Sequence, residues 1–514
     1  MNQKDQSVNT IARSAGLNMI VQVLIRLLSF VMNALLIRFI SVDYIGVVNV
    51  RLHLLSTTIL FLTREPIRKA CFDRKTDEWA LVNRVSWLVL PIGTVISVVF
   101  SLIWIYFMPS PNMEFYRESV IIYAVCAMIV LSSESCFVVT QMSLYTNIKV
   151  FVESTALVVR SILNCLLLGL WPSLGLRGFC IAEIAYSLLY PLLYLTRLSL
   201  LLRKPNSLPI HSLRDLLPSF KIAILSDSKG FLLIFFKQSC LKQLLTEGER
   251  YLLSLSSASM HDQGIYEIVN NLGSLFARFL FQPLEEGFYL FFSMEGSREQ
   301  KKQPNSVLSV CSILLRSLCY FGILVIAFGF PYASALLKLY GGASLVTPTA
   351  VWMLRIYCVY VLFLAENGIS EAFFMATAGV KALESYNWMM GCFSAAFVCV
   401  SWLMTPLMGS TGYIVANIVN MMCRCVHHAI CLKRAGLDSI CNKIRPDRRW
   451  LFCTLLTSGL LLLSEQRSLP YTPKSLCCHL LLGVASGLGL LGLLWVFDKD
   501  SVKQCSTLFK KKVE

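Results

Sequence analysis

The chain has 514 residues, of which 56% are hydrophobic and 15% charged, and its formal net charge is +16. Soluble domains contain roughly 45–50% apolar and about 25% charged residues, so the composition excludes an ordinary soluble protein. The basic excess indicates membrane topology and contact with anionic lipid rather than a nucleic-acid partner, because no soluble basic domain remains to hold one.

Apolar stretches long enough to cross a hydrocarbon core of about 30 Å recur along the whole chain. We therefore predict an all-α polytopic membrane protein of about fourteen transmembrane helices. The predicted spans are residues 17–40, 45–63, 85–107, 119–143, 150–171, 176–202, 231–256, 265–292, 306–330, 349–377, 385–407, 410–432, 450–464 and 475–497.

Lys and Arg residues concentrate in alternate loops, on the side that also holds both tails. The opposite side carries only Arg117, Arg177, Lys338, Arg467 and Lys474. Because cytosolic loops carry the excess of basic residues, we predict that both termini are cytosolic.

Motifs recur in the same order in the two halves of the chain, which predicts a duplicated six-helix unit. An even number of helices per unit gives both copies the same orientation, so the two lobes form a parallel pseudo-repeat. The paired motifs are Arg64-Glu65-Pro66 with Phe281-Gln282-Pro283, Glu134-x-x-Phe137-x-x-Thr140 with Glu371-x-x-Phe374-x-x-Thr377, Glu153-Ser154 with Glu384-Ser385, and Gly175-x-x-Gly178 with Gly409-x-x-Gly412.

This repeat and two basic, proline-containing loops predict the domain organisation. The predicted parts are a first lobe at 1–205, a cytosolic linker at 206–230, a second lobe at 231–434, a second linker at 435–449, two C-terminal helices at 450–498 and a cytosolic tail at 499–514.

Intramembrane charges cluster in the first two predicted spans of each lobe. Each costs about 2.5–3.5 kcal/mol on insertion scales, so it tends to face a cavity or a partner. Arginine suits a diphosphate because its planar fork donates two parallel hydrogen bonds. We predict a cationic cavity for a diphosphate-bearing head group, lined by Arg26, Arg38, Arg64, Arg278 and Lys237.

Two alternatives stay open for these charged residues. The arginines can instead pair with glutamates such as Glu65, Glu134 or Glu285 to lock helices together, or extend to the membrane interface. Glu134 and Glu371, which are equivalent in the repeat, can carry protons or form packing hydrogen bonds. No catalytic residues, cofactor or metal site are predicted, and the Cys423, His427 and Cys431 cluster is interpreted as packing.

The chain ends Lys511-Lys512-Val513-Glu514. A dilysine at this position has the form of a retrieval signal read in the cytosol, which predicts the endoplasmic reticulum membrane. An ordinary solvated basic tail explains the same residues equally well.

Three segments resemble the eukaryotic dolichol-linked oligosaccharide translocation protein family. They are VVNVRLHLLSTTILFLTREPIRKACF at 47–72, EGERYLLSL at 247–255 and FARFLFQPLEEGFYLFFS at 276–293. The similarity extends over essentially the whole chain, and a looser one connects it to a wider exporter superfamily that includes multidrug exporters and bacterial lipid-linked sugar flippases.

The resemblance implies a role in N-glycan assembly. The expected substrate is a dolichol diphosphate carrying five mannoses and two N-acetylglucosamines, moved from the cytosolic to the lumenal face by alternating access while its tail stays in lipid. It further implies that Arg38, Arg64 and Arg278 bind the diphosphate. Coupled charge pairs are expected to involve Glu249, Arg250 and Glu285.

Two other functions stay open at this stage. One is an accessory protein that binds the lipid-linked oligosaccharide without moving it, and the other is a cation-coupled small-molecule exporter. The expected partners are the dolichol-linked oligosaccharide, membrane lipids and other N-glycan assembly proteins, and the chain is expected to be a monomer.

Overall fold

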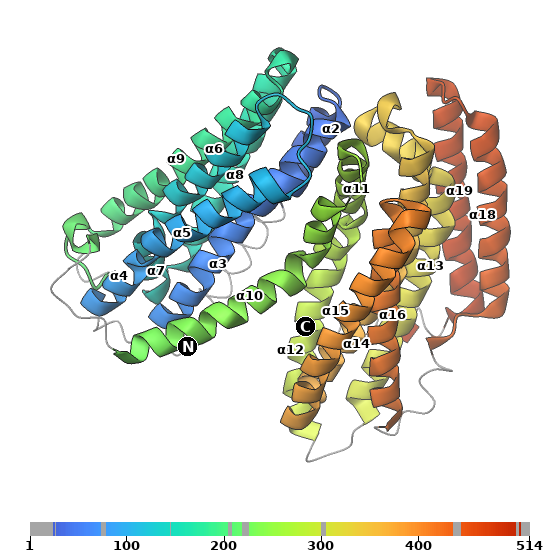
Figure 1. The fold of residues 1–514 in the computed structure, drawn as a ribbon. Helices are drawn as coiled ribbons and strands as arrows, with labels where there is room; N and C mark the ends of the chain where they lie inside the picture. The colour runs from blue at the N-terminus through green and yellow to red at the C-terminus, as the bar shows by residue number, and fades with distance from the viewer. Residues whose placement is uncertain are drawn as a thin grey trace. The chain divides into compact units, whose positions relative to one another are not determined.

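The computed structural model describes residues 24–25, 27–72, 79–143, 145–203, 208–217, 226–256, 258–299, 305–434, 444–499 and 503–504. Over these ranges the chain is helical throughout and contains no strand (Figure 1). The predictions that concern Arg26, Lys511 and Lys512 lie outside the described residues.

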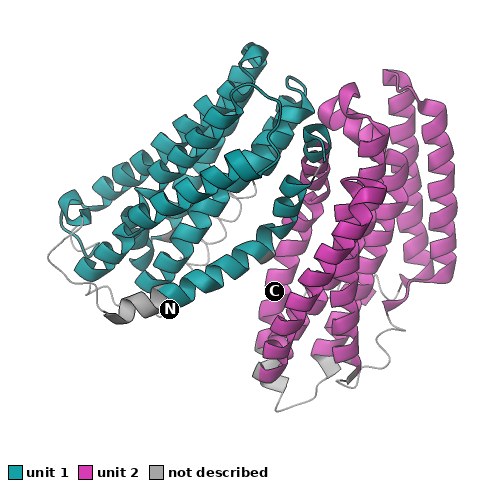
Figure 2. Cartoon of the chain, in the orientation of Figure 1, with its two compact units in different colours: residues 1–264 teal, residues 265–514 magenta. Residues whose placement is uncertain are grey.

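The chain divides into two compact units, residues 1–264 and 265–514 (Figure 2). The repeat in the sequence instead predicts that the second lobe begins at residue 231. The contacts assign the segment after 231 to unit 1 because α10 (Ser226–Leu255) packs along α3 (His53–Phe72). The two lobes that the repeat defines stay a prediction, because a repeat groups segments by the similarity of their sequences and not by their contacts.

In unit 1, α3 is the central helix and packs against α5, α6 and α10. Its first two turns are largely buried, with Leu54, Leu55 and Ile59 each 0% exposed. The other elements are α2 (Val42–Ile45), the π-helical turn η1 (Gly46–Leu52), α4 (Trp79–Trp87), α5 (Val89–Leu102), η3 (Ile103–Phe107), α6 (Tyr116–Leu131), α7 (Glu134–Met142), α8 (Thr146–Leu170), η4 (Pro172–Leu174), α9 (Leu176–Leu201) and η5 (Leu213–Leu216).

In unit 2, α14 (Pro348–Thr377) has the central position and packs against α12, α13 and α16. The other elements are η6 (Ala277–Phe281), α12 (Gln282–Glu299), α13 (Asn305–Gly341), η7 (Ala343–Leu345), α15 (Val380–Met408), α16 (Thr411–Arg434), α18 (Arg448–Ser468) and α19 (Pro473–Phe497). Helix α11 (Met260–Gly273) contains the boundary between the units.

Ten helices in the described part of the chain are long and apolar enough to cross a membrane. Together with the all-helical architecture, they confirm the predicted polytopic membrane fold. The count of fourteen stays a prediction. The predicted spans at 231–256, 265–292 and 450–464 do lie on helices, but α10, α12 and α18, which carry charged residues, are not among the ten. Such helices need water or polar partners along part of their length.

The linker that follows α9 is anchored to α4 by side chains that bind its backbone. Asn83 Nδ2 donates to Asp215 O at 3.1 Å and to Leu217 O at 3.0 Å, and Trp87 Nε1 donates to Leu216 O at 2.6 Å. The Asp215 carboxylate accepts hydrogen bonds from the amides of Ser212 and His211, which lowers the pKa of this carboxyl group. The ionised Asp215 carboxylate therefore stabilises the folded segment at pH values above the pKa that it has in the unfolded chain. This stabilisation is lost as the pH falls through the lowered pKa of the folded state.

We predict that Asn83→Ala speeds amide exchange of residues 208–217 about thirtyfold at neutral pH, because two hydrogen bonds of roughly 1 kcal/mol each are lost. In the unsubstituted protein, the same segment should lose protection as the pH drops below about 4. Hydrogen exchange read by mass spectrometry measures both. The exposed Asn147→Ala is the matched control, and unchanged exchange in Asn83→Ala would contradict the anchoring role.

The C-terminal helices α18 and α19 are attached to unit 2 by buried polar contacts. Glu465 on α18 is 3% exposed, and its Oε2 accepts from Arg355 Nη2 on α14 at 2.7 Å, while its Oε1 accepts from Ser334 on α13. Tyr332 Oη also donates to His479 O of α19 at 2.6 Å. Glu465 therefore ties α18 to two helices of the repeat.

We expect Glu465→Gln to lower the free energy of unfolding by about 3 kcal/mol, because it leaves the Arg355 guanidinium buried without its counter-charge. Thermal unfolding in detergent measures the shift, with the exposed Glu384→Gln as the control. Equal melting temperatures for the two variants would show that the pair does not stabilise the unit.

Candidate functional site

A cluster of two arginines and one glutamate lies where α3 meets α7 in unit 1. Glu134, at the first position of α7, has a side chain that is only 2% exposed. Arg64 Nε lies 3.0 Å from Glu134 Oε2, and Arg68 donates from Nη2 to the same oxygen at 3.1 Å and from Nε to Oε1. The arginines are one helical turn apart on α3, so both reach the same carboxylate.

Aromatic rings and a carbonyl complete this arginine–glutamate cluster. The Arg68 guanidinium lies 3.6 Å from the centroid of Phe137, and that of Arg64 lies 5.7 Å from Tyr190 on α9. Arg64 Nη2 also donates to Val130 O at 3.2 Å. Glu134 therefore serves here as a counter-ion that joins helices, and the cluster keeps one net positive charge.

A second ion pair lies in unit 1, where Arg160 Nη1 on α8 donates to Glu183 Oε2 on α9 at 3.0 Å. Arg51, in the π-helical turn η1, is 0% exposed and donates to Ser254 O at 3.3 Å and Gln263 Oε1 at 3.4 Å. Sequence reasoning missed the Arg160 pair, although a single arginine in an apolar helix was a signal for it.

The other predicted binding residues have different environments. Arg38 is exposed and follows the short apolar helix Leu27–Ile37, and Lys237 is exposed on α10. Arg278, in the π-helical turn η6, is half-buried and donates to Ser274 Oγ and, at 3.0 Å, to Asn271 Oδ1. Both of these partners are uncharged side chains.

The predicted charge pair on α10 has a different closest contact. Arg250 Nη1 donates to Glu247 Oε2 at 3.1 Å, one turn earlier on the same helix. A pair between Arg250 and Glu249 stays a prediction.

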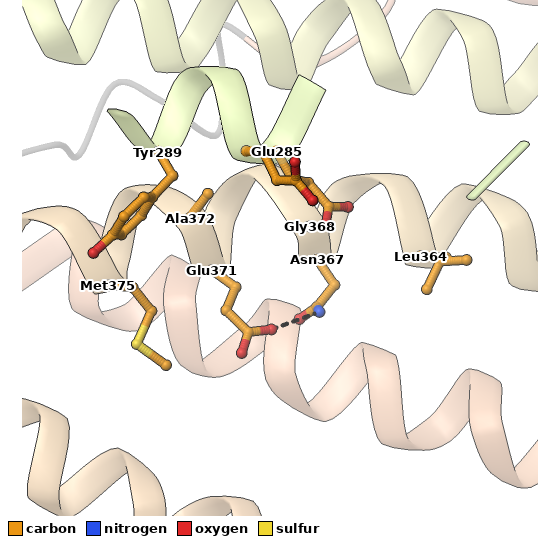
Figure 3. A pocket seen from close by; sticks show the side chains of 9 residues that line it. Glu285, Tyr289, Leu364, Asn367, Gly368, Glu371, Ala372 and Met375 are labelled. Carbon is orange, nitrogen blue, oxygen red and sulfur yellow. Dashed lines mark hydrogen bonds between the residues drawn. The ribbon is translucent and has the colours of Figure 1, made fainter. Parts of the chain in front are cut away.

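Unit 2 contains an open pocket of about 500 Å³ between α12 and α14. Figure 3 shows Glu285 and Tyr289 reaching it from α12, and Asn367 and Glu371 from α14. Gly368 lies directly against the Glu285 carboxylate, so a Cβ at this position would clash with it. We call this space the acidic pocket; its lining residues are Glu285, Glu286, Tyr289, Leu364, Asn367, Gly368, Glu371, Ala372 and Met375.

Few groups neutralise the carboxylates of the acidic pocket. Glu371 Oε2 accepts from Asn367 Nδ2 at 2.9 Å and lies 4.0 Å from Arg424 Nη1, while Glu286 Oε1 accepts from Gln282 Nε2 at 2.9 Å. Three carboxylates thus face one guanidinium. Among the described residues, no group of three or more His, Cys, Asp or Glu side chains is placed to hold a metal ion.

An all-helical membrane fold with polar residues held inside its helical units defines the class of the protein as a polytopic transporter-like membrane protein. Residues 10–508 match the family model described as Rft protein, and the chain therefore belongs to the Rft protein family.

Curated relatives named Man(5)GlcNAc(2)-PP-dolichol translocation protein RFT1 agree with this assignment. The protein from Xenopus tropicalis is 38% identical over 445 residues, covering 82% of this chain and 81% of its own length. The mouse protein is 38% identical over 429 residues, covering 80% and 79%. The Drosophila melanogaster protein is 30% identical over 558 residues, covering 97% and 98%.

Solved structures of two exporters share the fold. The lipid II flippase MurJ in an inward closed conformation has a TM-score of 0.61 and 11% sequence identity, covering 93% of this chain and 98% of its own. An inward-facing multidrug resistance MATE family transporter has a TM-score of 0.57 and 14% identity, covering 82% and 99%. At these identities the likeness concerns the fold alone.

We predict that Glu134→Gln lowers the free energy of unfolding by about 3–5 kcal/mol, because Arg64 and Arg68 are then left without a counter-charge. The exposed Glu118→Gln on the neighbouring α6 is the matched control. Thermal unfolding in detergent measures the loss, and adding Arg68→Gln to Glu134→Gln should recover part of it. A fully additive double variant would refute the pairing role.

Proposed function

We propose that this protein translocates the dolichol-diphosphate-linked Man(5)GlcNAc(2) precursor from the cytosolic to the lumenal face of the endoplasmic reticulum membrane. The observation that carries the proposal is the near full-length similarity to relatives named for this translocation, at 38% and 30% identity. The protein acts by alternating access and without catalytic residues, and both of its termini are cytosolic.

We further propose that arginines and a lysine bind the diphosphate. In this proposal Arg38, Lys237 and Arg278 each bind phosphate oxygens, and Arg26 is a further basic residue assigned to this role. Arg64, which is committed to Glu134, contributes through the residual charge of the arginine–glutamate cluster. Guanidinium groups suit this task because they stay charged in a low dielectric and bind phosphate oxygens bidentately.

The dolichol tail stays in lipid, whereas the polar head crosses the membrane. An isoprenoid chain gains nothing from leaving the hydrocarbon region, whereas a charged diphosphate at the bilayer centre needs compensating charge from the protein. The protein therefore lowers the barrier mainly for the head group.

Vesicles reconstituted with the purified protein and labelled Man(5)GlcNAc(2)-PP-dolichol test the proposal. We expect the protein to accelerate movement of the label between leaflets, and Arg278→Ala to slow it about tenfold, because a charged hydrogen bond contributes roughly 1.5–3 kcal/mol. The exposed Arg449→Ala is the matched control.

Binding of the lipid is measured in the same preparation. A protein that binds the glycolipid but does not accelerate its movement would contradict translocation and indicate an accessory binding role instead. Equal rates for Arg278→Ala and Arg449→Ala would remove Arg278 from the diphosphate site.

A further inference from the structure

The acidic pocket of unit 2 has a chemistry that diphosphate binding does not use. Glu285, Glu286 and Glu371 supply three carboxylates, and in the described part of the chain the ion pair given for them is that of Arg424 with Glu371. A pocket with this net negative charge repels a diphosphate. It therefore serves another part of the substrate or another ligand.

The acidic residues of this pocket coincide with exchanges of charge within the predicted internal repeat. Pro66 on α3 and Pro283 on α12 occupy equivalent places, and Arg68 and Glu285 each lie two residues after that proline. Glu134 and Glu371 are likewise equivalent. In unit 1, Arg68 pairs with Glu134. In unit 2 the residue at the equivalent position in the sequence is Glu285, a second carboxylate that lines the acidic pocket together with Glu371.

Asn367 gives an independent indication of a missing ligand. Its side chain is 5% exposed, and its Nδ2 donates to Glu371, yet its Oδ1 has no hydrogen-bond partner among the described residues. A buried acceptor left without a donor costs roughly 1–3 kcal/mol. Because Asn367 lines the acidic pocket, a ligand with hydroxyl or amide donors would satisfy this oxygen.

The remaining properties of the pocket favour an uncharged, hydroxyl-rich ligand. Carboxylates and an amide oxygen are acceptors, so they pair with neighbouring hydroxyl donors. The exposed ring of Tyr289 provides an apolar face beside these acceptors. A volume of about 500 Å³ is within the range of small-molecule sites and far exceeds the space of one bound ion.

We propose that the acidic pocket binds sugar units of the lipid-linked oligosaccharide through Glu285, Asn367 and Glu371. This inference rests on the proposed function, because it assigns the neutral glycan of that substrate to a place in unit 2. The glutamate that replaces arginine after the repeat's proline thus excludes the diphosphate and accepts hydrogen bonds from the glycan.

The test compares two lipids that differ only in the glycan: Man(5)GlcNAc(2)-PP-dolichol and bare dolichyl diphosphate. Affinities are measured for the full-length protein in nanodiscs. We expect Glu285→Ala and Glu371→Ala each to weaken binding of the glycan-bearing lipid about tenfold and to leave binding of the bare lipid unchanged. The exposed Glu118→Ala, in unit 1, is the control.

A second measurement distinguishes a loss of glycan binding from poor folding of a variant. Free Man(5)GlcNAc(2) should compete with the glycan-bearing lipid for the unsubstituted protein, and Asn367→Leu should abolish this competition without changing affinity for the bare lipid. Weaker binding of both lipids, or of neither, would overturn the proposal. A third outcome would also overturn it: the variants still prefer the glycan-bearing lipid, but their lipid binding no longer depends on Na⁺ or Ca²⁺. That result would identify the pocket as a cation site.

The outcomes also separate this inference from the translocation proposal. Selective loss of glycan affinity in a protein that does not accelerate lipid movement would support the pocket and contradict translocation. Normal translocation together with unchanged glycan affinity in Glu285→Ala and Glu371→Ala would support translocation and contradict the glycan pocket.

Discussion

A charged side chain inside a bilayer requires an opposite charge or water beside it, and this constraint underlies the ion pairs that join helices within each unit. Arg64 and Arg68 share Glu134, Arg160 binds Glu183, and Arg355 binds Glu465. In each case the acid and the base come from different helices. The ion pairs therefore specify which helices become neighbours, a selectivity that apolar packing in lipid provides only weakly.

The motifs of the predicted repeat recur in both units with different charged residues around them, so the two units differ in their chemistry. Around Glu134 the arginines exceed the carboxylate by one charge, while around Glu371 the carboxylates exceed the guanidinium by two. A duplicated protein with identical charge clusters would hold the same ligand group twice. A substrate with an anionic diphosphate and a neutral glycan instead suits two unlike sites.

The sequence was sufficient to predict the all-helical membrane fold, but not to predict which helices pack against each other. In lipid every backbone group must be satisfied within its own helix, so hydropathy predicts the spans well. Glu134 was noticed in the sequence, yet its pairing with Arg64 and Arg68 depends on how α3 and α7 lie side by side, which hydropathy does not encode. The assignment of α10 to unit 1 has the same cause, because it depends on packing along α3.

A translocator must bind its substrate firmly enough to select it and loosely enough to release it. Hydrogen bonds from glycan hydroxyls meet this requirement, since water replaces them at little net cost in an open pocket. A diphosphate is different, because strong pairing with several uncompensated arginines would trap it. On the proposed function, the pairing of Arg64 and Arg68 with Glu134 leaves one net positive charge, which holds an anion less tightly than two uncompensated arginines and so favours its release.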